Sequence, residues 1–534
     1  KMCAAVRGNG HYLFSHFGSL ALLTEEAGPF SAMSGGSSAS VTTFTYESMI
    51  LNPALNSSTG KEFNSRLALM LKSIMGYVQV ISESKEVNAM TGLVGLGQKI
   101  QEAGIDKLGP DEIEETAKRL HTVFSDPAVA AMINPQVFAM LSNTDSLGFK
   151  SFGYKISELK NAAATIGAFD ASDQNILFRE GVVSFKGLAI ILNRIGNFYA
   201  GYGPYDQHSW EDFFQSCANI TRGKNWSEAA ATNIGKTSCG EKFKSLLTNY
   251  RTKVKDNNYV FNKNRSDDDV GQHLPAILAS SVIIGENSKS AFFAARKKYR
   301  NDESFQFEMD FKDVKFGYFV NIKDQSKLQA YVDGSSDNKL SKFLILNKSS
   351  QLKWGKALQI SPMEPGLSPL LWAEEHPHLF PEGSSNIAYA GGWSDLAPVQ
   401  VLKGIGCEET IYITRQGFES DFLTKSRPIT EATAVHGVAE IMGLKQSNKE
   451  AQFEWNQPNS GFRSAVNQAD AVWCTDWNLA GNNAFEFMFN HTYDIGNKDT
   501  IHGTGNRTGF VANSTYMKTK FLNRRLTKST VGCL

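Results

Sequence analysis

The chain has 534 residues, of which 41% are apolar, and its 54 basic side chains balance its 54 acidic ones. This apolar content is enough for a large buried core and excludes a disordered chain. A net charge of zero disfavours a nucleic-acid binder, which normally has a basic excess, and disfavours membrane docking by bulk charge. No apolar run reaches the roughly 18 residues that span a bilayer, so no transmembrane segment is predicted.

Two features of the sequence indicate whether the protein is exported or cytoplasmic. They are the six cysteines and several N-x-S/T sequons, such as Asn219-Ile220-Thr221. An even number of cysteines permits three disulfides in 15 pairings, and free buried thiols are the alternative. Sequons of this kind are sites of glycosylation in exported proteins. Together they favour an exported protein over a cytoplasmic one and leave the pairing open.

The first 50 residues predict a compact alternation of strands and helices. Residues 2–6 (MCAAV) form an apolar run that ends in a glycine loop, which is typical of a buried strand. Apolar residues at helical spacing follow over 13–23, and Gly28-Pro29 ends that helix. A second short strand is predicted over 30–34, and a helix from Ala39. Two strands joined by one helix indicate a right-handed parallel crossover and an α/β fold.

The remaining chain divides by pattern. Residues 55–269 show mainly helical periodicity and predict an inserted cap. Residues 270–420 are rich in β patterns, with strands expected at 316–322, 343–347, 357–361 and 410–414. We therefore predict a catalytic core built from 1–54 and 270–420. Residues 421–534 form a C-terminal region without an assigned fold, apart from a helical stretch at 432–444.

Residues 34–40 (SGGSSAS) combine the features that a serine nucleophile needs. A sharp strand-to-helix turn exposes the hydroxyl, and the residues two positions before and after it must be small. Ser38 satisfies this rule with Gly36 and Ser40, and Ser37 satisfies it with Gly35 and Ala39. The positive N-terminus of the following helix favours a developing anion at this turn.

The loop after the first strand supplies a second candidate feature. Gly8, Asn9 and Gly10 precede this turn by about 28 residues in the sequence. If the two strands are neighbours, the amides of this loop lie beside the turn and can form an oxyanion hole. Glycine at these positions lets the backbone approach a substrate closely.

Residues 8–20 (GNGHYLFSHFGSL) and the turn at 36–40 resemble the opening of patatin-like phospholipases, the superfamily of patatin and cytosolic phospholipase A2. The resemblance implies a three-layer α/β/α core and maps the nucleophile to Ser38 and the oxyanion hole to Gly8, Asn9 and Gly10. That family uses a Ser–Asp dyad without histidine, and no cofactor is predicted for this chain.

The family's aspartate lies in a D-G-G motif, and residues 387–402 (IAYAGGWSDLAPVQVL) resemble that motif, preceded by the proline-containing segment 361–365. The aspartate position is occupied by Ala390, whose methyl group cannot accept a proton. Three explanations are open: an introduced Asp→Ala change, a natural pseudoenzyme, or another carboxylate. Asp395 and Asp333 are the alternative carboxylates.

The resemblance implies a lipid acyl-ester hydrolase of the phospholipase A or lysophospholipase type, acting on phospholipid or another lipid ester with peripheral membrane contact. A lipid acyltransferase that uses the same acyl-enzyme, or a catalytically dead lipid- or protein-binding protein, are the alternatives. His436 is the position where a hydrolase triad would place a base. His376 and His378 lack a partner motif, so no metal is predicted.

Overall fold

The computed structural model describes part of the chain, and every structural statement below concerns that part. The described residues are 1–8, 15–56, 58, 60–82, 85, 110–123, 125, 130, 135, 185–201, 207–217, 238–256, 274–283, 314–322, 324–334, 343–345, 358, 360–362, 371–372, 387–389, 391, 398–415, 468–475 and 508–512.

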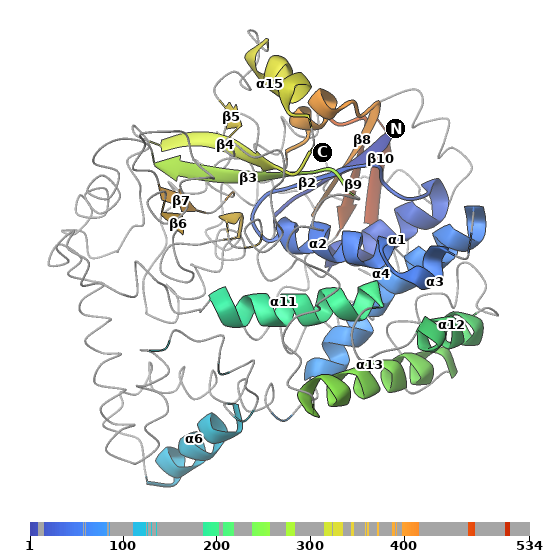
Figure 1. Ribbon diagram of the computed structural model, residues 1–534, viewed down its shortest axis with the longest axis vertical. Helices are drawn as coiled ribbons and strands as arrows, with labels where there is room; N and C mark the ends of the chain where they lie inside the picture. The colour runs from blue at the N-terminus through green and yellow to red at the C-terminus, as the bar shows by residue number, and fades with distance from the viewer. Residues whose placement is uncertain are drawn as a thin grey trace, which may run out of the picture.

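The core is a mostly parallel β-sheet with the strand order β10-β9-β8-β1-β2-β3-β4-β5 (Figure 1). Neighbouring strands from β9 to β3 in this order run parallel, and β10 and β4 are antiparallel to their neighbours β9 and β3. The strands are β1 (Met2–Val6), β2 (Met33–Gly35), β3 (Ala276–Ile283), β4 (Val314–Val320), β5 (Phe343–Ile345), β6 (Leu371–Trp372), β7 (Ile387–Tyr389), β8 (Glu409–Arg415), β9 (Ala471–Thr475) and β10 (Thr508–Ala512).

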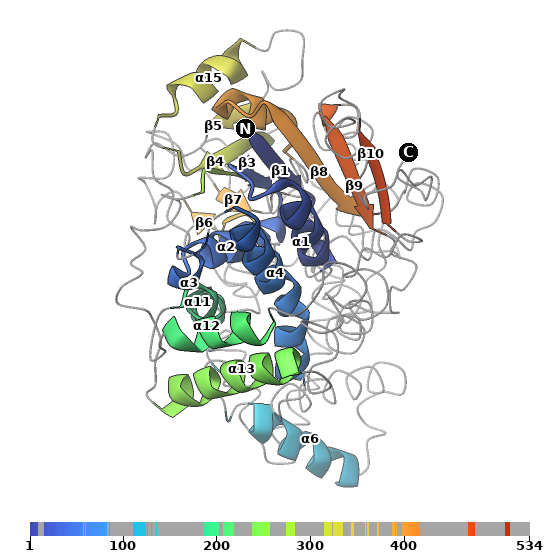
Figure 2. The same ribbon diagram turned by 90° about the vertical axis from the view of Figure 1, so that its right-hand side faces the viewer.

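Helices cover both faces of this sheet. On one face lie α1 (Ser15–Ala27), α2 (Ala39–Ile50) and α4 (Gly60–Ser82), where α1 packs against α4 (Figures 1 and 2). On the other face α15 (Ser326–Asp333) packs against the 3-10 helix η10 (Gln400–Ile405). Because successive side chains of a strand point to opposite faces, Ala4 joins the first core and Ala5 the second.

Every described element between 53 and 256 is a helix, as the periodicity predicts. These elements are α3 (Pro53–Asn56), α4, α6 (Pro110–Val123), α11 (Phe185–Ala200), α12 (Gln207–Ser216) and α13 (Ser238–Asp256). All of them except α6 share the first core with α1 and α2, since α11 packs along α2 and α13 packs against α4. These helices are therefore continuous with the helical layer of the sheet.

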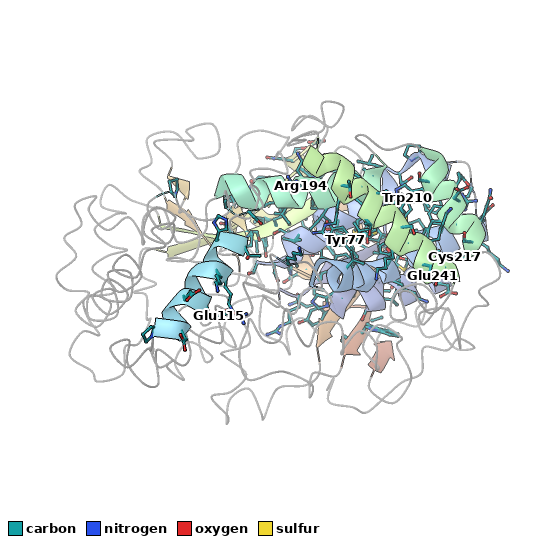
Figure 3. The ribbon with its side chains drawn as sticks, turned by 90° about the horizontal axis from the view of Figure 1, so that it is seen from below. Tyr77, Glu115, Arg194, Trp210, Cys217 and Glu241 are labelled. Carbon is teal, nitrogen blue, oxygen red and sulfur yellow. A yellow bond between two sulfur atoms is a disulfide. The ribbon has the colours of Figure 1, made fainter. Side chains whose placement is uncertain are left out.

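A buried aromatic cluster holds α4, α11, α12 and α13 together (Figure 3). The Phe198 ring lies 5.1 Å from Trp210 and 5.3 Å from Tyr250, measured between ring centroids. The Trp210 indole N–H donates to the Phe198 carbonyl over 3.1 Å, which satisfies its polar atom inside the core. Burial raises the pKa of Tyr77 to about 12, so its phenol stays neutral within this cluster.

Most predicted strands are found within a few residues of their expected bounds. The strand predicted at 357–361 is wrong, because Leu358 and Ile360 are helical. An apolar pair two residues apart in so short a run does not separate strand from helix. After residue 420, where the sequence predicted no strand, β9 and β10 extend the same sheet. The helix predicted at 432–444 lies outside the described residues.

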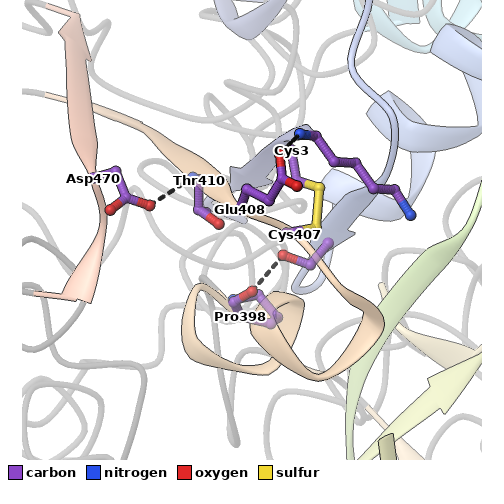
Figure 4. Close-up of a disulfide and its surroundings, with 8 residues drawn as sticks. Cys3, Pro398, Cys407, Glu408, Thr410 and Asp470 are labelled. Atoms are coloured by element: carbon purple, nitrogen blue, oxygen red, sulfur yellow. Dashed lines mark hydrogen bonds and ion pairs between the residues drawn. A yellow bond between two sulfur atoms is a disulfide. The ribbon is translucent and has the colours of Figure 1, made fainter. Parts of the chain in front are cut away.

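Two disulfides join described cysteines. Cys3–Cys407 links the start of β1 to the segment before β8, and Cys217–Cys239 links α12 to α13. Figure 4 shows the first bridge beside Pro398 and the start of β8. The sequence left open both the pairing of the six cysteines and the alternative of free thiols. For these four cysteines the structure shows two disulfides.

Removing the Cys3–Cys407 bridge is expected to destabilise the protein more than removing Cys217–Cys239. The bridged residues are 404 apart in the first case and 22 apart in the second. The longer loop restricts the unfolded chain more, so we expect losses of about 5 and about 3 kcal/mol, respectively. Guanidinium unfolding of the two Cys→Ala double variants measures both values, and the reverse order would contradict this account.

Candidate active site

The strand-to-helix turn between β2 and α2 has its corner at Ser37. Among the described residues, Ser37 is the one non-glycine residue with a positive φ, 53°. A side chain in this backbone region is strained, and strain of this kind is concentrated at functional sites. A Cβ added to Gly35 would lie 2.8 Å from the Cβ of Ala39, so the positions two before and two after Ser37 must be small. These are the steric features of a nucleophile turn centred on Ser37.

Ser38, the nucleophile that the resemblance implies, lies one residue further, at the start of the helix. Its backbone angles are helical, with φ −60° and ψ −19°, and its carbonyl accepts the Val41 N–H. Ser40, two residues later, donates its hydroxyl to the Ser37 carbonyl over 2.9 Å. Ser37 and Ser38 are 5% and 6% exposed, so both are buried.

The loop predicted to form an oxyanion hole begins beside this turn. β1 and β2 are parallel neighbours with Val6 opposite Gly35, which confirms the predicted parallel pairing. Arg7 and Gly8 therefore follow β1 at the level where Gly36 and Ser37 follow β2. Gly8 is buried, and Asn9 and Gly10 lie outside the described residues.

His16 supports the start of this loop from α1. Its Nε2 lies 2.9 Å from the Arg7 carbonyl oxygen, and the side chain is fully buried. Because a carbonyl can only accept, the Nε2 atom carries the proton in this contact. His16 therefore supports the loop that adjoins the turn.

The other side of the turn is formed by β3. One edge of β3 is paired with β4 over 277–283, so β2 and β7 share the opposite edge. On that edge β2 pairs with 276–278, and β7 runs antiparallel opposite 281–283. The pairing of β2 with β3 therefore ends at Gly35, opposite Leu278. The pairing of β7 with β3 runs in the opposite direction and ends at Tyr389, opposite Ser281.

Between the residues of β3 that pair with β2 and those that pair with β7, Gly391 packs against Ala279. Gly391 lies so close that an added Cβ would be 2.2 Å from the Ala279 carbonyl oxygen. The Gly391 N–H donates to the Ser361 carbonyl over 2.8 Å, and the Ser361 hydroxyl donates to the Ala279 carbonyl over 2.9 Å. Position 390 is outside the described residues, but both of its chain neighbours are placed on this edge of β3.

A further contact joins Pro398 to β2. The Ser34 hydroxyl, inside β2, donates to the carbonyl of Pro398, and both residues are buried. Sequence reasoning did not select Ser34 or Ser361 as functional residues. Ser34 has the same spacing of small neighbours as Ser37, with Ala32 and Gly36, and that pattern was the available signal.

Asp333, one of the alternative carboxylates, is not brought to this turn. Asp333 lies exposed on the last turn of α15, where the Gln329 side-chain amide donates to its carboxylate over 2.8 Å. This helix covers the sheet face opposite to α2. Asp395, His376, His378 and His436 lie outside the described residues.

No family model, curated protein or solved structure matches the chain. Within the described ranges, no group of histidine, cysteine, aspartate and glutamate side chains is arranged to hold a metal ion. No helix in the described part of the chain has the length and apolar character needed to cross a membrane.

Proposed function

We propose that the protein is a lipid acyl-ester hydrolase of the patatin-like type, with Ser37 as nucleophile and position 390 as the place of the catalytic aspartate. The strained φ at Ser37, the small residues around it and the buried Gly8 beside it support this proposal. Helices on both faces of the sheet agree with the three-layer core that the resemblance implies.

The single observation that carries the proposal is the arrangement along β3. β2 ends opposite Leu278, and Gly391 packs against the next residue, Ala279. Gly391 therefore lies in the same small region as the turn that carries Ser37. A carboxylate at position 390 is then suited to accept a proton from the nearby serine hydroxyl.

The chemistry follows from these positions. The Ser37 oxygen attacks the acyl carbonyl while its proton passes to the carboxylate at 390, and the negative charge develops on the carbonyl oxygen. Backbone amides of the loop that begins at Gly8 stabilise this oxyanion. The carboxylic acid then protonates the leaving alcohol, and water or another acceptor releases the acyl group from Ser37. Water as acceptor gives hydrolysis, and a second alcohol gives acyl transfer.

The alanine at position 390 favours a second candidate function, that of a binding protein without catalytic activity. With a methyl group at this position no proton acceptor is supplied, and the same surfaces then serve a catalytically dead lipid- or protein-binding protein. The two disulfides agree with an oxidising, extracellular compartment for either function. With zero net charge, engagement of a lipid surface rests on apolar and aromatic side chains or on a local basic patch.

Restoring the carboxylate tests the proposal. We expect the Ala390→Asp protein to release fatty acid from phosphatidylcholine vesicles or to cleave p-nitrophenyl butyrate about 10² to 10⁴ times faster than the parent chain. Ala390→Asn is the matched control, because asparagine has nearly the shape of aspartate but a neutral amide that cannot act as a base. This variant should stay at the parent rate. A folded Ala390→Asp protein that cleaves neither ester would refute the hydrolase and favour the binding protein.

A further inference from the structure

Two hydroxyl groups of α2 make hydrogen bonds to the backbone on either side of the turn at Ser37. After the corner, the Ser40 hydroxyl donates to the Ser37 carbonyl over 2.9 Å, and the Ser40 N–H donates to the same oxygen over 3.1 Å. Before β2, the Phe30 N–H donates to the Tyr46 hydroxyl over 2.9 Å. α2 is therefore bonded to both ends of the segment 30–37, which contains β2 and the turn.

The bonds from Ser40 hold the backbone at the corner itself. Because a peptide unit is planar, holding the Ser37 carbonyl oxygen also holds the plane that joins Ser37 to Ser38, and with it the ψ torsion of Ser37. The Ser40 side chain is fully buried, so water does not readily take the place of its hydroxyl. A strained backbone persists only where its surroundings hold it, and these two bonds are such a restraint on the positive φ of Ser37.

The bond to Tyr46 holds the chain where it enters β2. Tyr46 is fully buried, and its ring centroid lies 6.1 Å from that of Phe30, so packing supports the hydrogen bond between the two residues. Burial raises the pKa of Tyr46 to about 12, so at neutral pH the acceptor is a neutral phenol. β2 begins at Met33, shortly after this contact.

These contacts give the two hydroxyls a common role. Building on the proposed function, we propose that Ser40 and Tyr46 are positioning residues, which together keep the nucleophile Ser37 in its positive-φ conformation. Ser40 acts through the Ser37 carbonyl, and Tyr46 acts through the chain that leads into β2. All of residues 30–46 belong to the described part of the chain.

The consequence for catalysis follows from the precision that a nucleophile requires. A displacement of about 1 Å can lower the rate about 100-fold. Without the Ser40 hydroxyl, the Ser37 carbonyl loses one of the two bonds that hold it. Without the Tyr46 hydroxyl, the buried Phe30 N–H loses its acceptor, which disfavours the present path of the chain. Either loss is expected to lower kcat with little effect on KM.

The first test uses the Ala390→Asp protein as parent and p-nitrophenyl butyrate as substrate. We expect Ser40→Ala and Tyr46→Phe each to lower kcat about 10- to 100-fold, with KM within about twofold of the parent. A variant that keeps kcat within about twofold of the parent would overturn the assignment for that residue.

Two control variants remove a buried hydroxyl of the same kind at a distance from the turn. The Ser48 hydroxyl donates to the Phe44 carbonyl within α2, and the Tyr250 hydroxyl donates from α13 to the Arg194 carbonyl of α11. Ser48→Ala and Tyr250→Phe should therefore leave kcat and KM unchanged. Controls that lose as much activity as the two test variants would show a general loss of stability and overturn the assignment for both residues.

Hydrogen exchange provides a second measurement, which does not depend on activity and separates this inference from the proposed function. We expect Tyr46→Phe to accelerate exchange at the Phe30 amide about tenfold. Ser40→Ala is expected to accelerate exchange about tenfold at the Ala39 amide, which is bonded across the turn to the Gly36 carbonyl.

The two measurements fail independently. If the Ala390→Asp protein has no activity, the proposed function fails, while accelerated exchange at the two amides still supports the restraint on the turn. Unchanged exchange at both amides would refute that restraint whether or not the protein is active. The Ser48→Ala and Tyr250→Phe controls should leave exchange at both amides unchanged.

Discussion

Removing the Ser37 hydroxyl from the Ala390→Asp protein is expected to lower kcat by about 10⁴-fold or more, which is the scale of losing a nucleophile. Ser38→Ala in the same protein is expected to cost less than about tenfold. The reason is that Ser37 occupies the strained corner, with φ 53°, whereas Ser38 already has helical backbone angles. Steady-state hydrolysis of p-nitrophenyl butyrate by the two variants gives both ratios.

The strain at Ser37 adds a second expectation for the same position. Ser37→Gly removes the hydroxyl and also relieves the positive φ, so we expect this variant to be inactive yet up to about 1 kcal/mol more stable than Ser37→Ala. Thermal unfolding of the two variants provides the comparison. If Ser38→Ala abolished turnover while Ser37→Ala retained it, the nucleophile would be the residue that the family resemblance implies.

Gly391→Ala is expected to produce the second large effect. Its Cβ would lie 2.2 Å from the Ala279 carbonyl oxygen and 2.8 Å from the Ala279 carbonyl carbon, and both atoms belong to the backbone of a central strand. Because β3 is held by neighbours on both edges, the segment at Gly391 must move instead. We expect kcat of the Ala390→Asp protein to fall about 100-fold and the free energy of unfolding to fall by about 1–3 kcal/mol.

Gly406→Ala provides the control for this prediction. Gly406 follows η10 with φ +87°, and no heavy atom lies within 4 Å of its added Cβ. This substitution introduces backbone strain of about 1–2 kcal/mol without a collision, so stability should fall and kcat should not. Full activity of Gly391→Ala would show that the segment can shift without disturbing the site.

The sequence predicted the parts of the fold that depend on local pattern. The strand at 2–6, the helix that follows and the helix from Ala39 each have their own periodicity and end signals, and the parallel crossover follows from their order. The sequence left Ser37 and Ser38 as candidates within residues 34–40, and the structure adds a positive φ at Ser37, a backbone angle that the sequence does not contain.

Long-range contacts account for what the sequence could not predict. The hydroxyl of Ser34 and the carbonyl of Pro398 are separated by 364 residues, and no local pattern links them. β10 (TGFVA) contains threonine and glycine and lacks a clear alternation, so its pairing with β9 has no strong local signal. The pairing Cys3–Cys407 was one of many that six cysteines allow.

The most direct test is to locate the covalent adduct. The Ala390→Asp protein is treated with a fluorophosphonate, digested, and the peptide that contains residues 34–40 is sequenced by tandem mass spectrometry. We predict a single phosphonyl group on Ser37, with labelling lost in Ser37→Ala. An adduct on another serine of this peptide would move the nucleophile, and a folded protein that acquires no adduct would contradict the serine-hydrolase account.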